Sequence, residues 1–454
     1  MVSNLFKFKW LNNLSPVQLI LFFYCVAVFV STCILAMPIA HEDGVDLSLM
    51  DTLFIAVSAI SVTGLTPTSI SETFNTFGYF LLAFIMQFGA VGIMAIGTSI
   101  WVFLGKKIGL RERRLIMTDQ NQTSFAGMVR LIQQIMYVIL TIELIGFIIL
   151  GTYYLQYFPT VGEAYLNGFF SSVSATTNGG FDITGDSLFM FRNDYFVQFI
   201  TMLLIIFGAI GFPVLIEVKE YMFARAEVRK SLRFSLFTKV TSLTFFALVV
   251  VGAIFIAIFD AGNFFADKSW HEILFYSLFQ SVTTRSAGLS TMDVSQLSEQ
   301  NHLFISLLMF IGASPSSAGG GIRTTTFALV LIFIITYARG GASIRLFGRE
   351  VYQDDLLKAV TVSLMAIALV FGSVLVISIF EPYSMASILF EVTSAFGTVG
   401  LSLGITSELT TPSKIILMLL MFIGRVGIIT ALFMFKNNKS SGKFHYPKEK
   451  IIIG

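Results

Sequence analysis

The sequence predicts an all-α integral membrane protein made of four tandem helix–pore-loop–helix units around one central pore. Two observations support this fold class. First, 55% of the 454 residues are hydrophobic and only 12% are charged, whereas soluble domains carry about 25% charged residues. Second, one glycine-centred motif occurs four times at nearly even intervals, which indicates an internal repeat. The formal charge of +2, without a dense basic tract, gives no reason to expect a nucleic-acid partner.

The repeated motif contains a glycine at the same place in each copy. The four copies are Ser61-Val62-Thr63-Gly64-Leu65, Thr176-Thr177-Asn178-Gly179-Gly180-Phe181, Thr284-Arg285-Ser286-Ala287-Gly288-Leu289 and Gly397-Thr398-Val399-Gly400-Leu401. A Ser-Ala pair lies upstream of the motif glycine in three copies, as Ser58-Ala59, Ser174-Ala175 and Ser394-Ala395. The third copy departs, with Val282-Thr283 in that place.

Each unit is expected to contain a long apolar run, a shorter run that ends near the motif, and a second long run. A helix needs about 20 residues to span a bilayer, so the pattern predicts eight spanning helices plus four re-entrant half-helices. The predicted half-helices are Leu49–Ile60, Tyr165–Ala175, Ile273–Thr283 and Met385–Ala395. The predicted units cover residues 14–104, 128–222, 236–340 and 356–436, followed by a tail at 437–454.

Basic residues predict the orientation of the chain. They concentrate at the N-terminus, around Lys106–Arg114, in Lys219–Lys239, in Arg339–Lys358 and in the tail, whereas the intervening loops are acidic. The positive-inside rule places these basic segments and both termini in the cytoplasm. The four half-helices must then enter the membrane from the outside and return to it.

Four re-entrant segments are expected to meet around one axis, because irregular backbone inside a bilayer must line a cavity or be buried in protein. The C-terminal end of a half-helix carries partial negative charge, and carbonyl groups beyond it can replace the hydration shell of a cation. Glycine suits the narrowest point because it tolerates positive φ and allows close approach. The alternative is that the four glycines only cap their half-helices.

The second long run of the third unit is interrupted. Leu303–Ile311 and Phe327–Tyr337 are each too short to span, and the proline and clustered glycines between them resist helix formation. We expect this interrupting loop (312–326) to lie near mid-membrane and to obstruct the inner pore; a kinked, lipid-facing helix is the alternative. Its central residues are Ser314, Pro315, Ser316, Ser317, Ala318, Gly319, Gly320 and Gly321.

Several charged residues fall within predicted membrane segments. Arg425 lies in the apolar run Ile415–Phe435, where an ionised side chain costs roughly 2.5–3.5 kcal/mol. It is either a core arginine bonded to carbonyls or a pore-facing group that holds the interrupting loop or repels ions. Glu143 and Arg323 could each pair with a polar group or serve only in packing. For Arg285, a structural contact behind the third motif is favoured over contact with an ion.

These segments resemble the Trk/Ktr/HKT superfamily of potassium transporters, most closely the Ktr membrane subunit. The matching segments are Thr63-Gly64-Leu65, Ala287-Gly288, Met309–Ala313, Ser394–Leu401 and Met421–Arg425. The resemblance implies potassium transport across the plasma membrane through a selectivity filter whose backbone carbonyls bind K⁺. It implies the filter residues Val62, Thr63, Gly64, Asn178, Gly179, Gly180, Ser286, Ala287, Gly288, Thr398, Val399 and Gly400, with the interrupting loop and Arg425 as the gate.

This sequence has no phosphate-binding motif, so control by nucleotides would need another polypeptide. The same resemblance implies such a partner, a cytosolic ring of RCK-type nucleotide-binding subunits, together with a homodimer of the membrane subunit. No resident cofactor is expected, because K⁺ is cargo. A K⁺/Na⁺-permeable or Na⁺-coupled transporter of the same fold is the alternative. A transporter for another solute would show interrupted helices in inverted halves, whereas here only one spanning helix is expected to be interrupted. An enzyme is not expected, because no ligand cluster or nucleophile motif is found.

Overall fold

The computed structural model describes residues 15–92, 128–341 and 343–433, together with the single residues Gly109 and Glu449. Residues 93–104 of the first predicted unit and nearly all of the predicted tail therefore lie outside the described part. The basic segment Lys106–Arg114 is likewise outside it, apart from Gly109.

The described chain is mostly helical and follows the predicted order of long helix, half-helix and second helix in each unit. The first two units contain α2 (Pro16–Leu35), α3 (Leu49–Ser61) and α5 (Thr76–Val91), then α8 (Met128–Tyr154), α9 (Val161–Thr177), α10 (Tyr195–Ala209) and α11 (Phe212–Phe223). The third contains α13 (Leu236–Phe259), α14 (Trp270–Thr283), α15 (Glu299–Ile311) and α16 (Thr324–Ala338). The fourth contains α17 (Gln353–Phe380), α18 (Met385–Gly397), α19 (Thr411–Val426) and α20 (Ile428–Phe433).

Short elements connect these helices. They are α4 (Ile70–Thr73), α12 (Ala226–Arg229), four 3-10 turns (Pro38–Ala40, Phe189–Phe191, Val294–Gln296 and Thr406–Glu408) and a hairpin of β1 (Arg345–Leu346) with β2 (Arg349–Glu350). The two strands pair antiparallel, with Arg345 opposite Glu350.

The four half-helices α3, α9, α14 and α18 begin and end within a few residues of their predicted bounds. Each starts with a local cap, because a serine or threonine before a helix satisfies its free N–H groups. Ser48, Thr160 and Ser384 accept hydrogen bonds from the backbone three residues on. Before α14, the Ser269 N–H donates instead to the Glu272 carboxylate at 2.8 Å. The largest shift is in α9, which begins at Val161 rather than Tyr165 because Thr160 provides its cap.

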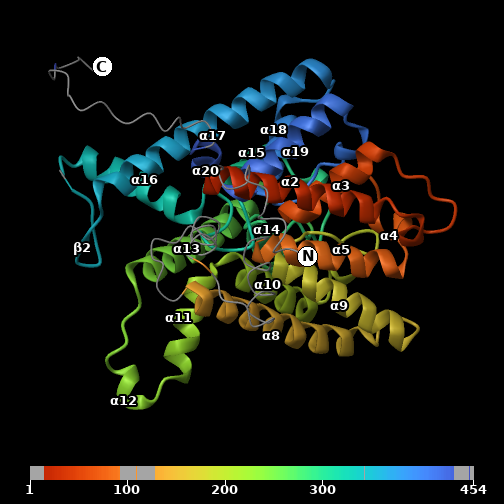
Figure 1. Cartoon of the computed structure of the whole chain (residues 1–454), viewed down its shortest axis with the longest axis horizontal. Helices are drawn as coiled ribbons and strands as arrows, with labels where there is room; N and C mark the ends of the chain where they lie inside the picture. Colours follow the sequence, from red (N-terminus) through yellow and green to blue (C-terminus); the bar gives the residue numbers. More distant parts are fainter. Residues whose placement is uncertain (1–14, 93–108, 110–127, 342, 434–448, 450–454) are drawn as a thin grey trace.

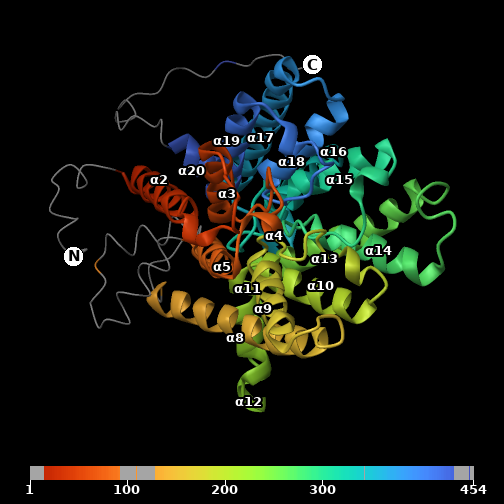
Figure 2. The same ribbon diagram turned by 90° about the vertical axis from the view of Figure 1, so that its right-hand side faces the viewer.

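The four units close into a ring in sequence order. Figure 2 shows them following one another around the centre, from red through yellow and green to blue. Each half-helix packs against the second helix of the preceding unit: α9 against α5, α14 against α10, α18 against α15, and α3 against α19. The last pair joins the fourth unit to the first, which closes the ring.

The expectation that only one spanning helix is interrupted is wrong. α10 and α11 are separate helices that meet at an angle of 107°, where Gly211 has a φ of +104° and Pro213 follows. α19 likewise ends before Gly427, whose φ is +93°. A residue with positive φ cannot continue a right-handed helix, so these glycines divide apolar runs that looked continuous in the sequence.

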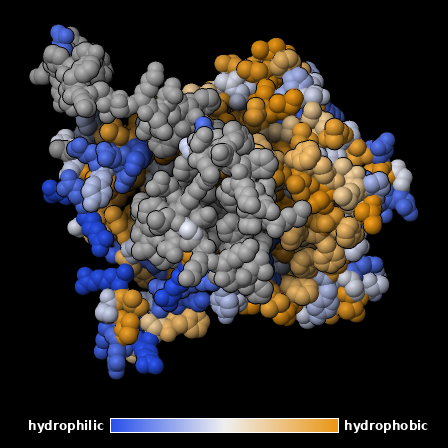
Figure 3. Space-filling model, in the orientation of Figure 1, coloured by the Kyte–Doolittle hydropathy of each residue, from blue (hydrophilic) through white to orange (hydrophobic). Residues whose placement is uncertain are grey.

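The exterior of the protein suits a bilayer. Within the described residues, four helices are long and apolar enough to cross a membrane, or five if α10 and α11 count as one span. The four long helices are the first helices of the units. The second helices are shorter than the prediction of eight spanning helices assumed, because each is interrupted or ends at a glycine. Figure 3 shows a broad hydrophobic area, with hydrophilic residues gathered at one end, where α12 and β2 lie in Figure 1, and again at the opposite edge.

Candidate functional site

The four motif glycines meet at the centre of the ring. A Cβ atom added to Gly64 would lie 2.8 Å from Gly180 Cα, and one added to Gly288 would lie 3.0 Å from Gly400 Cα. A Cβ on Gly400 would in turn lie 3.1 Å from Gly64 Cα. We call these four residues the glycine ring. A side chain at any of them would collide with a neighbouring loop, so glycine is required by space and not only as a helix cap.

Carbonyl oxygens alternate with the glycines around this ring. The atom nearest to each added Cβ is the carbonyl oxygen that precedes the neighbouring glycine. These four oxygens belong to Thr63, Gly179, Ala287 and Val399. The structure therefore brings together backbone from all four motifs, and the shared feature is a layer of oxygen atoms that can ligate a cation.

The backbone of each motif repeats one unusual conformation. Positive φ occurs at all four glycines and at the residues two before them, which are Val62, Asn178, Ser286 and Thr398. The residue between has negative φ in every copy. When successive residues alternate between left-handed and right-handed backbone conformations, their N–H groups point to one side of the chain. Their carbonyl groups therefore point to the opposite side. Among these twelve residues the four glycines alone are partly exposed, and the other eight are buried.

Side-chain hydroxyl groups behind the ring hold each loop. Ser58 Oγ accepts the Gly64 N–H at 3.0 Å, and Ser394 Oγ accepts the Gly400 N–H at 3.1 Å. Ser174 Oγ donates to the Phe181 carbonyl at 2.7 Å, and Thr283 Oγ1 donates to the Leu289 carbonyl at 2.6 Å. The sequence analysis noted the repeated serine without assigning a role; its spacing from the glycine was the available signal.

The third motif reaches the same place by a different path. α14 ends at Thr283 and its cap residue Thr284 keeps right-handed geometry, whereas Val62, Asn178 and Thr398 are left-handed caps. The chain then turns over Arg285, which is fully buried and donates from Nη2 to the Leu308 carbonyl at 2.8 Å. This contact lies toward α15, so the geometry favours a tie behind the motif over contact with an ion.

The interrupting loop lies directly against the third and fourth motifs. It occupies residues 312–323, because α16 resumes at Thr324 rather than Phe327. A Cβ added to Gly320 would lie 2.7 Å from Thr398 Oγ1, and the Gly320 N–H donates to Ser286 Oγ at 3.3 Å. All of Ser314, Ser316, Ser317, Ala318, Gly319, Gly320 and Gly321 are buried, and Pro315 is half-buried. A lipid-facing kink would leave this polar backbone in hydrocarbon, so the geometry disfavours that alternative.

Main-chain hydrogen bonds attach the interrupting loop to the bend between α10 and α11. The Ser314 N–H donates to the Ala209 carbonyl at 3.0 Å, and the Ala318 N–H donates to the Gly208 carbonyl at 3.1 Å. The Phe212 N–H donates in return to the Ser316 carbonyl at 2.8 Å. The breaks in the second and third units thus satisfy each other's backbone groups, as mid-membrane irregular backbone requires.

Arg425 joins the interrupting loop to the first unit. Its guanidinium donates to the carbonyls of Ser317 (3.2 Å) and Ala318, and also to those of Ala90 (2.7 Å) and Gly89 at the end of α5. Arginine suits this position because its planar fork presents five donors in fixed directions. These contacts fit a core arginine bonded to carbonyls and also fit a side chain that holds the loop, and the role of Arg425 as part of a gate stays a prediction.

Arg323 supports the loop from its own end. Its guanidinium donates to the carbonyls of Ser314 (3.3 Å), Gly319 and Arg425 (3.4 Å). Arg323 also has a φ of +79°, a conformation that is uncommon for a residue with a side chain. These bonds give Arg323 a place in the loop's own structure.

Polar side chains also join neighbouring units. Glu143 on α8 is buried and accepts from Gln87 Nε2 on α5 at 3.1 Å. Lys414 at the start of α19 donates from Nζ to Asp51 at the start of α3 at 2.8 Å. The first contact joins the first and second units, and the other joins the fourth unit to the first. Sequence reasoning expected a possible partner for Glu143 and did not single out Lys414.

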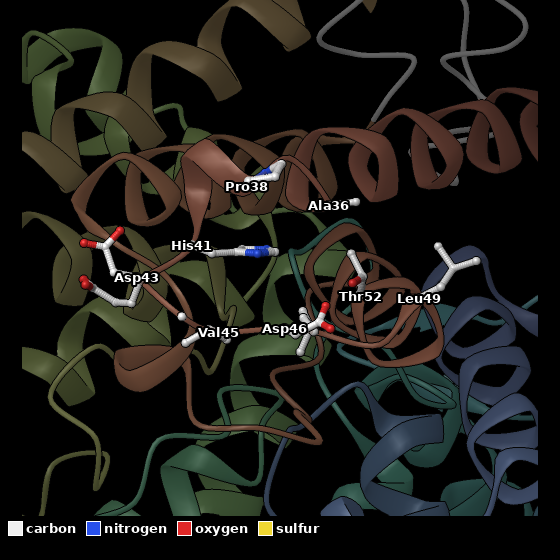
Figure 4. A pocket seen from close by; sticks show the side chains of 11 residues that line it. Ala36, Pro38, His41, Asp43, Val45, Asp46, Leu49 and Thr52 are labelled. Carbon is white, nitrogen blue, oxygen red and sulfur yellow. The ribbon is translucent and has the colours of Figure 1, made fainter.

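The described residues contain no group of three or more His, Cys, Asp or Glu side chains that could hold a metal ion. An acidic pocket of about 340 Å³ lies between the end of α2 and the start of α3. Figure 4 shows that the Asp43 and Asp46 carboxylates stay apart within it, with His41 between them. His41 Nε2 is 2.7 Å from the Leu35 carbonyl oxygen. The oxygen layer at the glycine ring is therefore the arrangement best suited to a cation.

Comparisons with known proteins give a family match and several similar sequences. The TrkH family profile, described as a cation transport protein, matches residues 26–446. Ktr system potassium uptake protein D of Bacillus subtilis is 56% identical, with 98% of this chain and 99% of the relative covered. Ktr system potassium uptake protein B of the same organism is 34% identical, with 98% of each chain covered.

A further relative and one solved structure extend the comparison. The potassium/sodium uptake protein NtpJ of Enterococcus hirae is 31% identical, with 98% of each chain covered. The crystal structure of the potassium transporter TrkH from Vibrio parahaemolyticus matches with a TM-score of 0.72, over 93% of this chain and 86% of that one. Sequence identity to that structure is 20%, so the match shows the fold.

Proposed function

Since this chain belongs to the TrkH family of cation transport proteins, we propose that it carries K⁺ across the membrane through the glycine ring. The family expected from the sequence motifs is confirmed, and the chain is a multi-pass membrane protein. The observation that carries the proposal is the closed ring of four glycines and four carbonyl oxygens. Each unit contributes only one glycine and one carbonyl oxygen to this ring, so all four repeats are needed to form the proposed ion site.

In this proposal the filter consists of the twelve motif residues, and K⁺ is bound by their backbone carbonyls. The gate consists of the interrupting loop, which lies against the filter, and of Arg425, which joins that loop to α5 of the first unit. The four predicted units, with bounds 14–104, 128–222, 236–340 and 356–436, are then four quarters of one pore. A loop held by hydrogen bonds suits gating, because its release would expose carbonyls that water can solvate.

The assembly belongs to the same proposal. Two of the relatives are named as parts of Ktr systems, which supports a partner subunit. We expect a homodimer with a cytosolic ring of RCK-type nucleotide-binding subunits and the basic tail at 437–454 as one contact. The chain would lie in the plasma membrane with both termini in the cytoplasm, as its alternation of basic and acidic loops favours.

A second candidate function is transport of both K⁺ and Na⁺. One relative is named a potassium/sodium uptake protein, and the second motif is rich in small residues at Gly179 and Gly180. A filter with one glycine per loop stacks fewer carbonyl layers than a longer filter sequence, so weaker discrimination between the two ions is expected. Ion competition distinguishes the two candidates.

The test is uptake of ⁸⁶Rb⁺ into K⁺-loaded liposomes that carry the purified protein, with external K⁺ or Na⁺ as competitor. We expect K⁺ to compete better than Na⁺, and Gly64→Ser to blunt that preference because its Cβ would lie 2.7 Å from the Gly179 oxygen. Gly44→Ser is the matched control, since Gly44 has a similar φ of +84° and no atom within 4 Å of an added Cβ. Equal competition by both ions would favour the second candidate.

If the wild type carries nothing, the closed gate is the first explanation to examine. Removal of Ser314–Gly321 should then produce uptake that K⁺ competes. Absence of K⁺-competed uptake in both proteins would contradict the proposed function.

A further inference from the structure

We infer that the Ser286 hydroxyl is a positioning group that couples the interrupting loop to the Thr398 carbonyl of the fourth filter segment. Ser286 lies two residues before Gly288 in the third motif and is fully buried. Its Oγ donates to the Thr398 carbonyl at 2.6 Å and accepts the Gly320 N–H at 3.3 Å. One oxygen atom therefore contacts both the filter and the gate. This inference rests on the proposed function.

The hydrogen bonds of Ser286 Oγ use its whole capacity. A hydroxyl group has one proton and two lone pairs. The proton goes to the Thr398 carbonyl, and the lone pairs face the Gly320 N–H and the Thr398 hydroxyl, which lies 3.0 Å away. With the loop in place, Ser286 has nothing left to offer an ion.

The partner carbonyl is a filter group. Thr398 lies two residues before Gly400 in the fourth motif, at the level where all four motifs have positive φ. A proton donated to this oxygen occupies one of its two lone pairs and draws electron density from the other, which weakens the carbonyl as a cation ligand. The seated loop therefore weakens cation binding at the Thr398 carbonyl, and a cation bound there weakens its hydrogen bond with Ser286. Coupling of this kind is reciprocal by thermodynamic necessity.

The hydroxyl groups that connect the loop to the filter, those of Ser286 and Thr398, occur at this position in only two of the four motifs. The corresponding positions of the first and second motifs are Val62 and Asn178, neither of which has a hydroxyl group. The loop also fits closely here, since a Cβ on Gly319 would lie 2.5 Å from Ser286 Cβ. The third motif's departure from the repeat thus coincides with the place where the loop meets the filter.

The first test is hydrogen–deuterium exchange of the loop peptide in the purified full chain, for wild type, Ser286→Ala and Ser281→Ala. A neutral hydrogen bond of this kind contributes about 1 kcal/mol, so Ser286→Ala should speed exchange of the loop about five-fold. Ser281→Ala is the matched control, because its buried hydroxyl bonds the Val249 carbonyl at 2.8 Å, away from the loop. Loop exchange that is unchanged by Ser286→Ala would overturn the inference.

The second test is a double-mutant cycle on ⁸⁶Rb⁺ uptake, with Ser286→Ala in the presence and absence of residues Ser314–Gly321. We expect uptake to rise about five-fold with the loop and to change less than two-fold without it. An equal change in both backgrounds would show that Ser286 acts on the filter alone, which contradicts the coupling. If no variant shows K⁺-competed uptake while loop exchange responds to Ser286→Ala, the coupling stands and the proposed function fails.

Discussion

Replacing Arg425 by glutamine should open the pathway, because this side chain ties the interrupting loop to the first unit. Its two terminal nitrogens divide their bonds between the two sides. Nη1 donates to the Ser317 and Ala318 carbonyls of the loop, and Nη2 donates to the Gly89 and Ala90 carbonyls of α5. Glutamine is shorter and uncharged, and cannot reach both sides at once.

The expected magnitude follows from the bonds that are lost. A hydrogen bond to a charged group contributes about 1.5–3 kcal/mol. Water can solvate the freed carbonyls when the loop moves. We therefore base the estimate on the free energy of one hydrogen bond, and not on the sum of the bonds between Arg425 and the loop. The open population, and with it the uptake rate, should therefore rise about 10- to 150-fold.

The assay is the initial rate of ⁸⁶Rb⁺ uptake into liposomes, normalised to the amount of folded protein. Arg425→Lys distinguishes tethering of the loop from repulsion of ions, since lysine keeps the positive charge and lacks the planar fork of hydrogen-bond donors. We expect it also to raise uptake. If Arg425→Gln matches the wild type, the tether is refuted. If Arg425→Gln raises uptake and Arg425→Lys does not, ion repulsion rather than tethering closes the pore.

Three other results are expected. Gly400→Ala should abolish the preference for K⁺ over Na⁺, because an added Cβ collides with the Thr63 carbonyl; Gly404→Ala, with open space around it, should behave as wild type. Lys414→Met should lower the melting temperature by a few degrees, since it strands a half-buried Asp51; a melting temperature equal to that of wild type would show that the pair is dispensable. Burial tends to raise the pKa of Glu381, but hydrogen bonds from Ser413 and Thr410 outweigh it and hold that pKa below its usual range. Its contribution to stability should therefore be present above the pKa of a free glutamate and be lost as the pH falls through the lowered pKa, and Glu381→Gln should flatten that loss in a pH series of thermal melts.

The repeat made most of the fold predictable. A hydrophobic half-helix followed by a glycine motif is a local pattern, and the structure places all four half-helices close to their expected bounds. Convergence of the motifs could also be inferred, because backbone that leaves a helix inside a bilayer has few places to go. The cyclic order of the units, in contrast, comes from the structure, where each half-helix packs against the preceding unit.

The breaks in the second helices were harder to predict. Gly92, Gly211 and Gly427 lie inside apolar runs whose hydropathy continues on both sides, so composition gave no signal at these positions. The third unit's break was evident only because Pro315 and several glycines cluster there. The pattern was nevertheless present, since a glycine with an apolar residue before it ends the second helix in every unit.

The contacts of the interrupting loop and Arg425 could not be predicted at all from one sequence. Arg425 finds its partners among carbonyl oxygens of α5 and the interrupting loop, which are more than one hundred residues away. Carbonyl groups exist at every residue, so no residue type identifies them in advance. The same holds for Ser286, whose role depends on the third loop's detour around Arg285.

The central claim is that the glycine ring binds K⁺, and the most direct test is to locate an ion there. Crystals of the purified protein equilibrated with Rb⁺ should give an anomalous difference peak on the axis between Gly64, Gly180, Gly288 and Gly400. An excess of K⁺ should remove the peak, and an equal excess of Na⁺ should leave most of it. An ordered ring without a peak, or a peak only at a site elsewhere in the protein, would contradict the account.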